Sequence, residues 1–182
     1  MINVQSSRGS NDGHDRIDKN ALVAQRTTTI ERTTAIASPP EMVFAVVNSP
    51  ETAAKIDPAV RLWSPDRRPI GVGTRFSIRG RLGRLPIRGT SEVTVWDPPT
   101  RSEFRSVAPR YPFRMSAQHR FDVRPDGGTD YTWTVSFHEV SVIARPFVVI
   151  AARRFRRALN AQATALVAYL RDVQTGAPPP EL

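Results

Sequence analysis

Three polar side chains occupy positions that are otherwise apolar: His119, Tyr131 and Gln162. Residues 113–124 alternate between apolar and polar types, and His119 belongs to the apolar set, so its imidazole is predicted to point into the interior. A buried imidazole can bond a carbonyl group or act as an acid or base near neutral pH. We therefore take His119 and Tyr131 as candidate catalytic residues. The alternative is a core histidine whose hydrogen bonds are satisfied by the backbone or by a neighbour such as Tyr131.

The remaining reactive groups are few. The 182 residues include no cysteine, which excludes thiol chemistry and disulfides. The sequence has no Gly-x-Ser-x-Gly motif, no phosphate-binding glycine loop and no His/Asp/Glu spacing typical of a metal site. Hydrolysis, phosphoryl transfer and metal catalysis are therefore disfavoured, and we expect no cofactor and no metal. What this inventory permits is chemistry that needs only a shaped apolar cavity and one or two polar groups.

A long amphipathic helix, roughly Pro146 to Val173, is expected to position Gln162. At helical spacing one face collects seven residues: Phe147, Ala151, Phe155, Leu159, Gln162, Leu166 and Tyr169. Small residues and one amide suit a helix that covers a cavity. Close helix–sheet packing through alanines, with Gln162 bonded to backbone, explains the same pattern, and the stripe alone does not separate the two interpretations.

The rest of the chain predicts the sheet on which this helix lies. Arg26 to Ala37 is threonine-rich and β-prone, and two short proline-initiated helices follow, up to Ile56. About six further strands come next, separated by turns such as residues 97–100 and 125–128. The fold class is therefore α+β, with a curved antiparallel sheet of about seven strands wrapped around the C-terminal helix and two short helices between strands 1 and 2.

A gap between the curled sheet and the helix is the expected ligand site. Its lining is predicted from the apolar strand faces and the helix stripe. The predicted ligand-binding residues are Phe76, Ile78, Val93, Val95, Phe104, Phe113, Met115, Ala117, His119, Phe121, Tyr131, Trp133, Val135, Phe147, Ala151, Phe155 and Gln162.

The charge of +9 comes from 26 basic against 17 acidic residues. Most arginines are scattered along strands, and only Arg153-Arg154 and Arg156-Arg157 cluster, without a nucleic-acid-binding motif. We expect no nucleic-acid partner, while peripheral contact with an anionic membrane or an acidic protein stays open. No segment is long enough to span a membrane, and a cytoplasmic location is expected. Residues 1–24 are predicted to be a disordered leader, 25–173 the folded domain and 174–182 a disordered tail. The oligomeric state is not predicted.

Three sequence segments carry a resemblance to a known family: Gly71-Val72-Gly73-Thr74-Arg75-Phe76, Glu92-Val93-Thr94-Val95-Trp96-Asp97-Pro98-Pro99, and Gly127-Gly128-Thr129 running into Tyr131-Thr132-Trp133. With the terminal helix and its arginine pairs, the chain resembles the START-like (SRPBCC) superfamily, in its bacterial polyketide cyclase/dehydrase and lipid-transport branch. The resemblance implies a helix-grip fold with an internal apolar cavity. It also implies binding of a lipid, polyketide or similar hydrophobic molecule.

Three hypotheses follow from the residues and the resemblance together. The first is a carrier or sensor that binds a hydrophobic small molecule. The second is a polyketide aromatase/cyclase-type enzyme that uses His119, Tyr131 or Gln162. The third is an interaction protein whose basic surface, especially Arg153 to Arg157, contacts an acidic partner or an anionic membrane.

Overall fold

The computed structural model describes residues 27–82, 84–107, 113–139 and 145–176. The elements follow in the order β1 (Thr27–Ile36), α1 (Pro40–Val47), α2 (Pro50–Ile56), β2 (Val60–Pro65), β3 (Arg75–Leu82), β4 (Leu85–Asp97), β5 (Arg101–Ser106), β6 (Phe113–Val123), β7 (Thr129–Glu139) and α3 (Arg145–Thr175). The predicted leader and most of the predicted tail lie outside the described residues. Helix α3 continues to Thr175, past the predicted domain boundary at residue 173.

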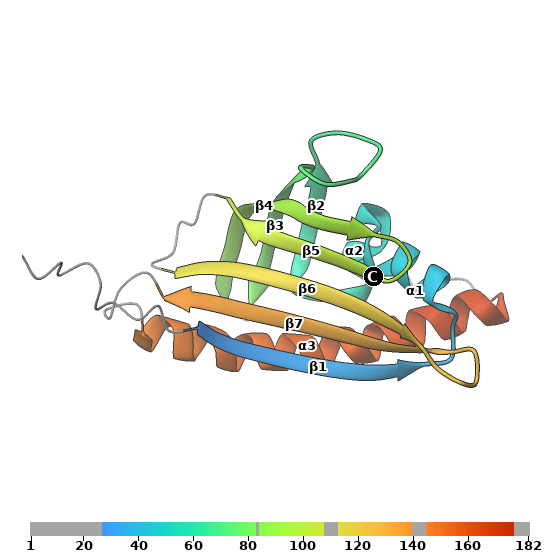
Figure 1. Ribbon diagram of the computed structural model, residues 1–182. Helices are drawn as coiled ribbons and strands as arrows, with labels where there is room; N and C mark the ends of the chain where they lie inside the picture. Colours follow the sequence, from blue (N-terminus) through green and yellow to red (C-terminus); the bar gives the residue numbers. More distant parts are fainter. Residues whose placement is uncertain (1–26, 83, 108–112, 140–144, 177–182) are drawn as a thin grey trace, which may run out of the picture.

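The strands form one antiparallel sheet in the order β1-β7-β6-β5-β4-β3-β2. Figure 1 shows that the sheet curves around α3, which runs along one face, while α1 and α2 sit at one end. This arrangement confirms the predicted helix-grip fold, including the seven strands and the two short helices between β1 and β2.

Local sequence explains why the small helices and the main hairpin form where they do. Pro40 and Pro50 stand in the first turns of α1 and α2, where a missing backbone N–H costs nothing. The hydroxyl oxygen of Ser49 accepts a hydrogen bond from the backbone N–H of Glu51 at 3.3 Å, which caps α2. Gly127 adopts φ = 80° in the β6–β7 turn, a conformation that a side chain disfavours.

A β-bulge in β4 changes which residues face the helix. Val93 pairs with Phe104, but Val95 pairs with Glu103, so Thr94 is an extra residue in β4. Val95 therefore lies on the same face as Glu103, away from α3, and the prediction that it lines the ligand site is wrong. The bulge turns Trp96 inward instead, where its ring packs edge-on against Phe44 at 5.2 Å between ring centroids.

The helix stripe also differs from the prediction at its N-terminal end. Phe147 is 55% exposed, whereas its neighbour Val148 is fully buried, so the predicted placement of Phe147 on the inner face is wrong. A helix advances about 100° per residue, so three successive steps of four residues accumulate a drift of about 120°. Counting back from buried Leu159, those steps lead to Phe147 on the outer side, while Val148 lies only about 20° from Leu159.

Buried apolar side chains form three clusters on the inner face of the sheet. The first joins α1, α2 and the second half of α3 to the sheet, through Ile36, Val43, Phe44, Val47, Ile56, Phe121, Tyr131, Leu166 and Leu170. The second lies under the first half of α3 and comprises Ile30, Val135, Phe137, Val148, Ala152 and Leu159. The third consists of Phe76, Val93 and Phe104 on β3 to β5.

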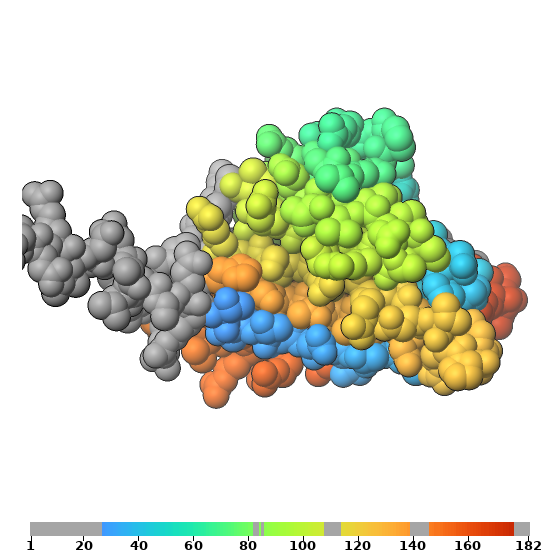
Figure 2. All heavy atoms as spheres, viewed as in Figure 1, coloured from blue at the N-terminus to red at the C-terminus, as the bar shows by residue number. Residues whose placement is uncertain are grey.

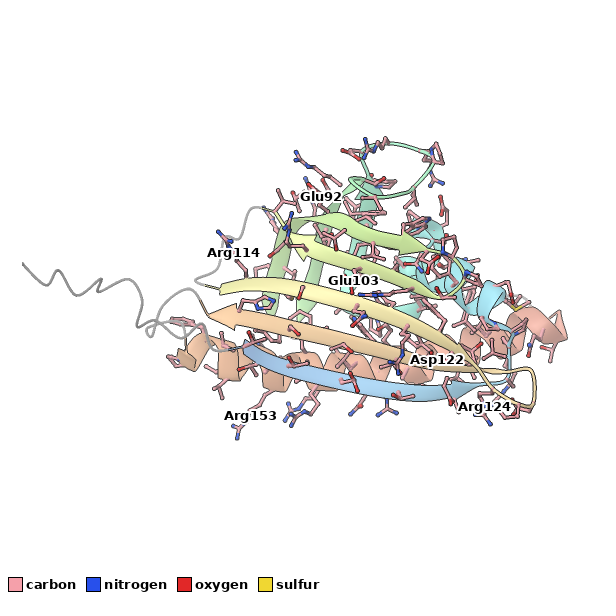
Figure 3. All side chains as sticks on the ribbon, in the orientation of Figure 1. Glu92, Glu103, Arg114, Asp122, Arg124 and Arg153 are labelled. Carbon is pink, nitrogen blue, oxygen red and sulfur yellow. The ribbon has the colours of Figure 1, made fainter. Side chains whose placement is uncertain are left out.

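The opposite face of the sheet carries charged side chains that pair locally. Arg75 Nε lies 3.1 Å from Glu92 Oε2, Arg120 Nε lies 2.8 Å from Asp122 Oδ2, and Arg101 pairs with Glu103. Figure 3 shows Glu92, Glu103 and Asp122 over this face. Within the described residues, no helix combines the length and the apolarity needed to cross a bilayer.

Candidate functional site

His119 lies where the three apolar clusters meet. Its β6 backbone pairs with Ser102 of β5 on one side and with Trp133 of β7 on the other. The imidazole ring stacks on Trp133 at 5.5 Å between centroids and meets the edge of Phe104 at 5.6 Å. Because aromatic rings surround it, the imidazole is a polar group in an apolar environment, as the alternation of β6 predicts.

One hydrogen bond joins His119 to Tyr131, with 2.7 Å between the imidazole Nδ1 and the phenol oxygen. Burial lowers the pKa of His119 to about 3. Burial, and then the negative charge of Asp57, raise the pKa of Tyr131 well above its usual value. Both side chains are therefore neutral across the physiological range. The structure thus contains the satisfied core pair that we gave as the alternative interpretation.

The lowered pKa of His119 argues against a role as an acid or base near neutral pH. With its pKa at about 3, the imidazole is neutral at neutral pH, so it is not an imidazolium acid and is a weak base, although its one N–H can still donate a hydrogen bond. Desolvation is the cause, because the surrounding aromatic rings cannot solvate an imidazolium ion. In this state His119 and Tyr131 are suited to hydrogen bonding and to holding a fixed geometry.

Asp57 is a titratable group that our sequence analysis did not select. It ends α2, and its carboxylate accepts a hydrogen bond from the backbone N–H of Ala59 at 2.9 Å. Burial raises the pKa of Asp57 to about 6, although the Ala59 hydrogen bond opposes the shift. In the sequence, Asp57-Pro58 indicated only a helix end, because the burial of the carboxylate arises from the packing of α2 on the sheet.

Two buried polar atoms lack a hydrogen-bond partner among the described residues: Trp133 Nε1 and Gln162 Oε1. The first is a donor on the sheet and the second an acceptor on α3, and both residues line the same small cavity. This cavity has a volume of about 10 Å³ and is also lined by Arg32, Thr34, Tyr131, Leu159 and Ala163. An unpaired buried donor or acceptor costs about 1–3 kcal/mol. A small polar group bound between these two atoms would form a hydrogen bond with each of them and remove this cost.

Most of the remaining predicted ligand residues lie on the inner face. Phe76, Val93, Phe104, Phe121 and Val135 are buried in the clusters, and Ile78, Met115, Ala117, Ala151 and Phe155 pack against them but stay partly exposed. The Phe113 side chain lies outside the described residues. Partial exposure of Met115, Trp133 and Phe155, which all pack on the second cluster, indicates that the interior is accessible beside the first half of α3.

A larger groove of about 330 Å³ lies on the other side of the sheet. Polar and charged residues such as Glu103, Arg105 and Gln118 line it, together with Thr94 of the β4 bulge. This groove was not predicted, and it does not include His119, Tyr131 or Gln162. Among the described residues, no three His, Asp or Glu side chains are grouped so as to hold a metal ion.

A curved antiparallel sheet around one long helix, here with an aromatic interior and a buried polar pair, defines a helix-grip fold. The chain belongs to the family described as polyketide cyclase / dehydrase and lipid transport, whose model matches residues 27–171. This match confirms the resemblance that the sequence segments indicated. A comparison with curated proteins found no match.

Solved structures share the fold at low sequence identity. The Zhui aromatase/cyclase from Streptomyces sp. R1128 has a TM-score of 0.66 and 16% identity, over 84% of this chain and 100% of that one. A START superfamily protein from Mycobacterium smegmatis has a TM-score of 0.65 and 10% identity, over 80% and 98%. The di-domain aromatase/cyclase BexL has a TM-score of 0.65 and 16% identity, over 81% of this chain and 47% of that one. At these identities the likeness establishes the fold alone.

Proposed function

We propose that this protein is a carrier or sensor that binds a hydrophobic small molecule between the sheet and α3, with the cytoplasm as its expected compartment. The observation that carries the proposal is the pair of unpaired polar atoms, Trp133 Nε1 and Gln162 Oε1, beside one cavity between β1, β7 and α3. Membership of a family named for cyclisation and lipid transport supports it.

The chemistry of the two atoms selects a hydroxyl group on the ligand. A hydroxyl can accept a hydrogen bond from the indole N–H of Trp133 and donate one to the amide oxygen of Gln162. A carbonyl or carboxylate oxygen can do only the first. The cavity of about 10 Å³ matches a single hydroxyl or water, which needs about 10–15 Å³.

The apolar body of the ligand would lie against the partly exposed inner-face residues. Met115, Ala117, Trp133, Ala151 and Phe155 pack against the same cluster and come from β6, β7 and α3. These side chains still have apolar area to bury, and each further 100 Å² covered by a ligand contributes about 2.5 kcal/mol. Since α3 supplies part of this surface, a ligand body of useful size requires the helix and its side chains to adjust.

The first experiment is native mass spectrometry of the protein purified gently from its own host, followed by extraction of any bound compound. The expected result is a stoichiometric hydrophobic molecule that carries a hydroxyl group. The second experiment compares two probes of similar size, 2-naphthol and 2-methylnaphthalene, by quenching of tryptophan fluorescence. We expect 2-naphthol to bind at least fivefold more tightly, and Gln162→Leu to remove this preference while Gln118→Leu, on the outer face, keeps it.

Two outcomes would contradict the proposal at different levels. Equal binding of both probes to the wild-type protein would refute the hydroxyl site and keep hydrophobic binding. No bound compound from the host, together with no binding of either probe, would refute hydrophobic binding itself. Circular dichroism of each variant separates loss of binding from loss of fold.

A polyketide aromatase/cyclase is the second candidate function. Two structural neighbours, Zhui and BexL, are aromatase/cyclases, and the His119–Tyr131 hydrogen bond supplies a fixed polar pair in the interior. In this function the pair would position a substrate carbonyl, since His119 is not protonated near neutral pH. His119→Ala should then abolish cyclisation of a linear polyketide substrate and leave the fold intact, whereas retained turnover would exclude this assignment.

A further inference from the structure

The first turns of α3 expose large apolar side chains to solvent. Phe147, Val149 and Ile150 are 55%, 49% and 51% exposed, whereas Val148 between them is buried in the second cluster. Single exposed apolar residues are common on protein surfaces, but three among four successive residues of one helix form a patch. Figure 2 shows the start of α3, in orange, emerging below the β1 edge of the sheet.

Arginines continue this surface along the helix. Ile150 is three residues from both Phe147 and Arg153 and seven from Arg157, so these four side chains share one outward face. Arg153, Arg156 and Arg157 are exposed, and Figure 3 shows the Arg153 side chain pointing away from the sheet. Arg154 makes another interaction and is not part of this surface.

This arginine group differs from the arginines on the sheet. Arg75, Arg101 and Arg120 form ion pairs with carboxylates, whereas among the described residues Arg153, Arg156 and Arg157 form none. Asp172, at the far end, is the one carboxylate on α3. Like charges spaced three and four residues apart destabilise a helix, so folding stability does not explain the group. An anionic partner outside the chain would explain this group of arginines.

We infer that this surface, centred on Phe147, Ile150, Arg153 and Arg157 and flanked by Val149 and Arg156, docks on an anionic lipid bilayer. The apolar side chains would enter the boundary between headgroups and acyl chains, and the guanidinium groups would bind lipid phosphates. The exposed apolar patch favours a bilayer over a soluble acidic protein, because arginines alone would suffice for the latter. This docking does not depend on the proposed ligand or its hydroxyl group.

Sedimentation of the full chain with vesicles tests the inference. Binding should be strong to phosphatidylcholine vesicles that contain phosphatidylserine and weak to phosphatidylcholine alone. Each arginine near an anionic surface contributes about fivefold in affinity, so Arg153→Gln with Arg157→Gln should weaken binding at least tenfold. The matched control, Arg101→Gln with Arg120→Gln, removes the same charge from the sheet and should weaken binding less than threefold.

The apolar patch has its own test. Phe147→Ser with Ile150→Ser should weaken vesicle binding at least tenfold, whereas Val123→Ser with Val173→Ser, exposed apolar residues elsewhere, should change it little. Soluble polyglutamate is the comparison ligand, and the Phe147/Ile150 variant should bind it as the wild type does.

Three results would overturn the inference. The first is absence of binding to anionic vesicles. The second is equal loss of binding in the arginine variant and its charge-matched control, which would mean that net charge alone attracts the protein. The third is unchanged vesicle binding by the Phe147/Ile150 variant while the arginine variant loses both vesicles and polyglutamate, which would assign the arginines to an acidic protein instead.

Discussion

Lowering the pH from about 7 to about 5 should shift the free energy of unfolding through two interior groups that act in opposite directions. The folded-state pKa of His119, about 3, lies below its usual value of 6.5, so the unfolded chain takes up the proton first and stability falls. The folded-state pKa of Asp57, about 6, lies above its usual 3.8, so the folded chain takes up the proton first and stability rises.

The size of each change in the free energy of unfolding depends on one overlap. It is the part of the interval between the usual and the folded-state pKa of the group that falls between pH 7 and pH 5. For His119 the range from 6.5 down to 5 covers about 1.5 pH units, worth about 2 kcal/mol of lost stability. For Asp57 the range from 6 down to 5 covers about one unit, worth about 1 kcal/mol gained. The wild-type protein should therefore lose only about 1 kcal/mol.

Two variants separate the opposing effects. Asp57→Asn keeps an acceptor for the Ala59 N–H and removes the carboxylate, so its stability should fall by about 2 kcal/mol between pH 7 and pH 5. His119→Asn keeps a polar atom near the position of Nδ1, and its stability should rise by up to about 1 kcal/mol over the same range. Urea denaturation at several pH values, with the slope on urea held constant across variants, measures both changes.

Because the stabilities of the two variants should change in opposite directions between pH 7 and pH 5, this prediction is easy to refute. Glu51 and Asp126 have lowered pKa values, so most of their effect on stability falls below this pH range. If the two variants change in the same direction, or if His119→Asn keeps the acid sensitivity of the wild type, then desolvation of the imidazole is not the source of the effect. Nuclear magnetic resonance titration of the His119 ring would confirm the assignment directly.

Three further substitutions test separate contacts. Gln162→Leu should raise the free energy of unfolding by about 1 kcal/mol, because it removes an unpaired buried amide oxygen. A lower melting temperature in thermal unfolding would show instead that this oxygen has a hydrogen-bond partner. Ser102→Ala removes the hydroxyl that donates to Asn48 Oδ1 at 2.8 Å and should cost about 1–2 kcal/mol in urea denaturation, with an unchanged value showing that Asn48 finds another donor. Gly80→Ala places a methyl group 1.9 Å from the carbonyl oxygen of Ala59 and should cost about 1–3 kcal/mol, unless calorimetry shows that β2 shifts freely.

The order of elements was predictable because each carries a local signal. Alternation over residues 113–124 predicted β6, and the glycine pair after Asp126 predicted the turn into β7. The hydrogen bond between His119 and Tyr131 was also named as an alternative, because both residues were assigned to the same face. These features depend only on neighbouring residues in the chain or on the pairing of two successive strands. Both can be predicted from sequence patterns.

The bulge in β4 was not predictable from alternation. Val93 and Val95 continue a regular pattern, and the extra residue appears only in the pairing with β5. One signal was present: Trp96, a large apolar residue, falls on the predicted polar face if the alternation is unbroken. A bulge restores it to the interior, so an out-of-phase aromatic residue at the end of a strand is evidence for a bulge.

The start of α3 was mispredicted for a related reason. Residues 147–152 are all apolar, so composition does not distinguish the buried face from the exposed one, and only the phase counted from Leu159 does. The same uninterrupted apolar run contains both buried Val148 and exposed Phe147. This apolar run is longer than the buried face of the helix requires. Such a run therefore indicates a second surface that also uses apolar side chains.

That second surface and the candidate ligand site belong to the same half of α3. Val148 and Ala152 pack on the inner cluster beside the partly exposed Met115 and Phe155, while Ile150 lies on the outward face of the same turns. A bilayer that contacts Ile150 would therefore lie next to the part of the interior that is accessible to solvent. A hydrophobic ligand could then pass between membrane and protein without crossing water, where each exposed CH₂ group costs about 0.8 kcal/mol. If docking and ligand binding both occur, variants of the outer face should slow ligand uptake from vesicles without changing affinity for the same ligand in solution.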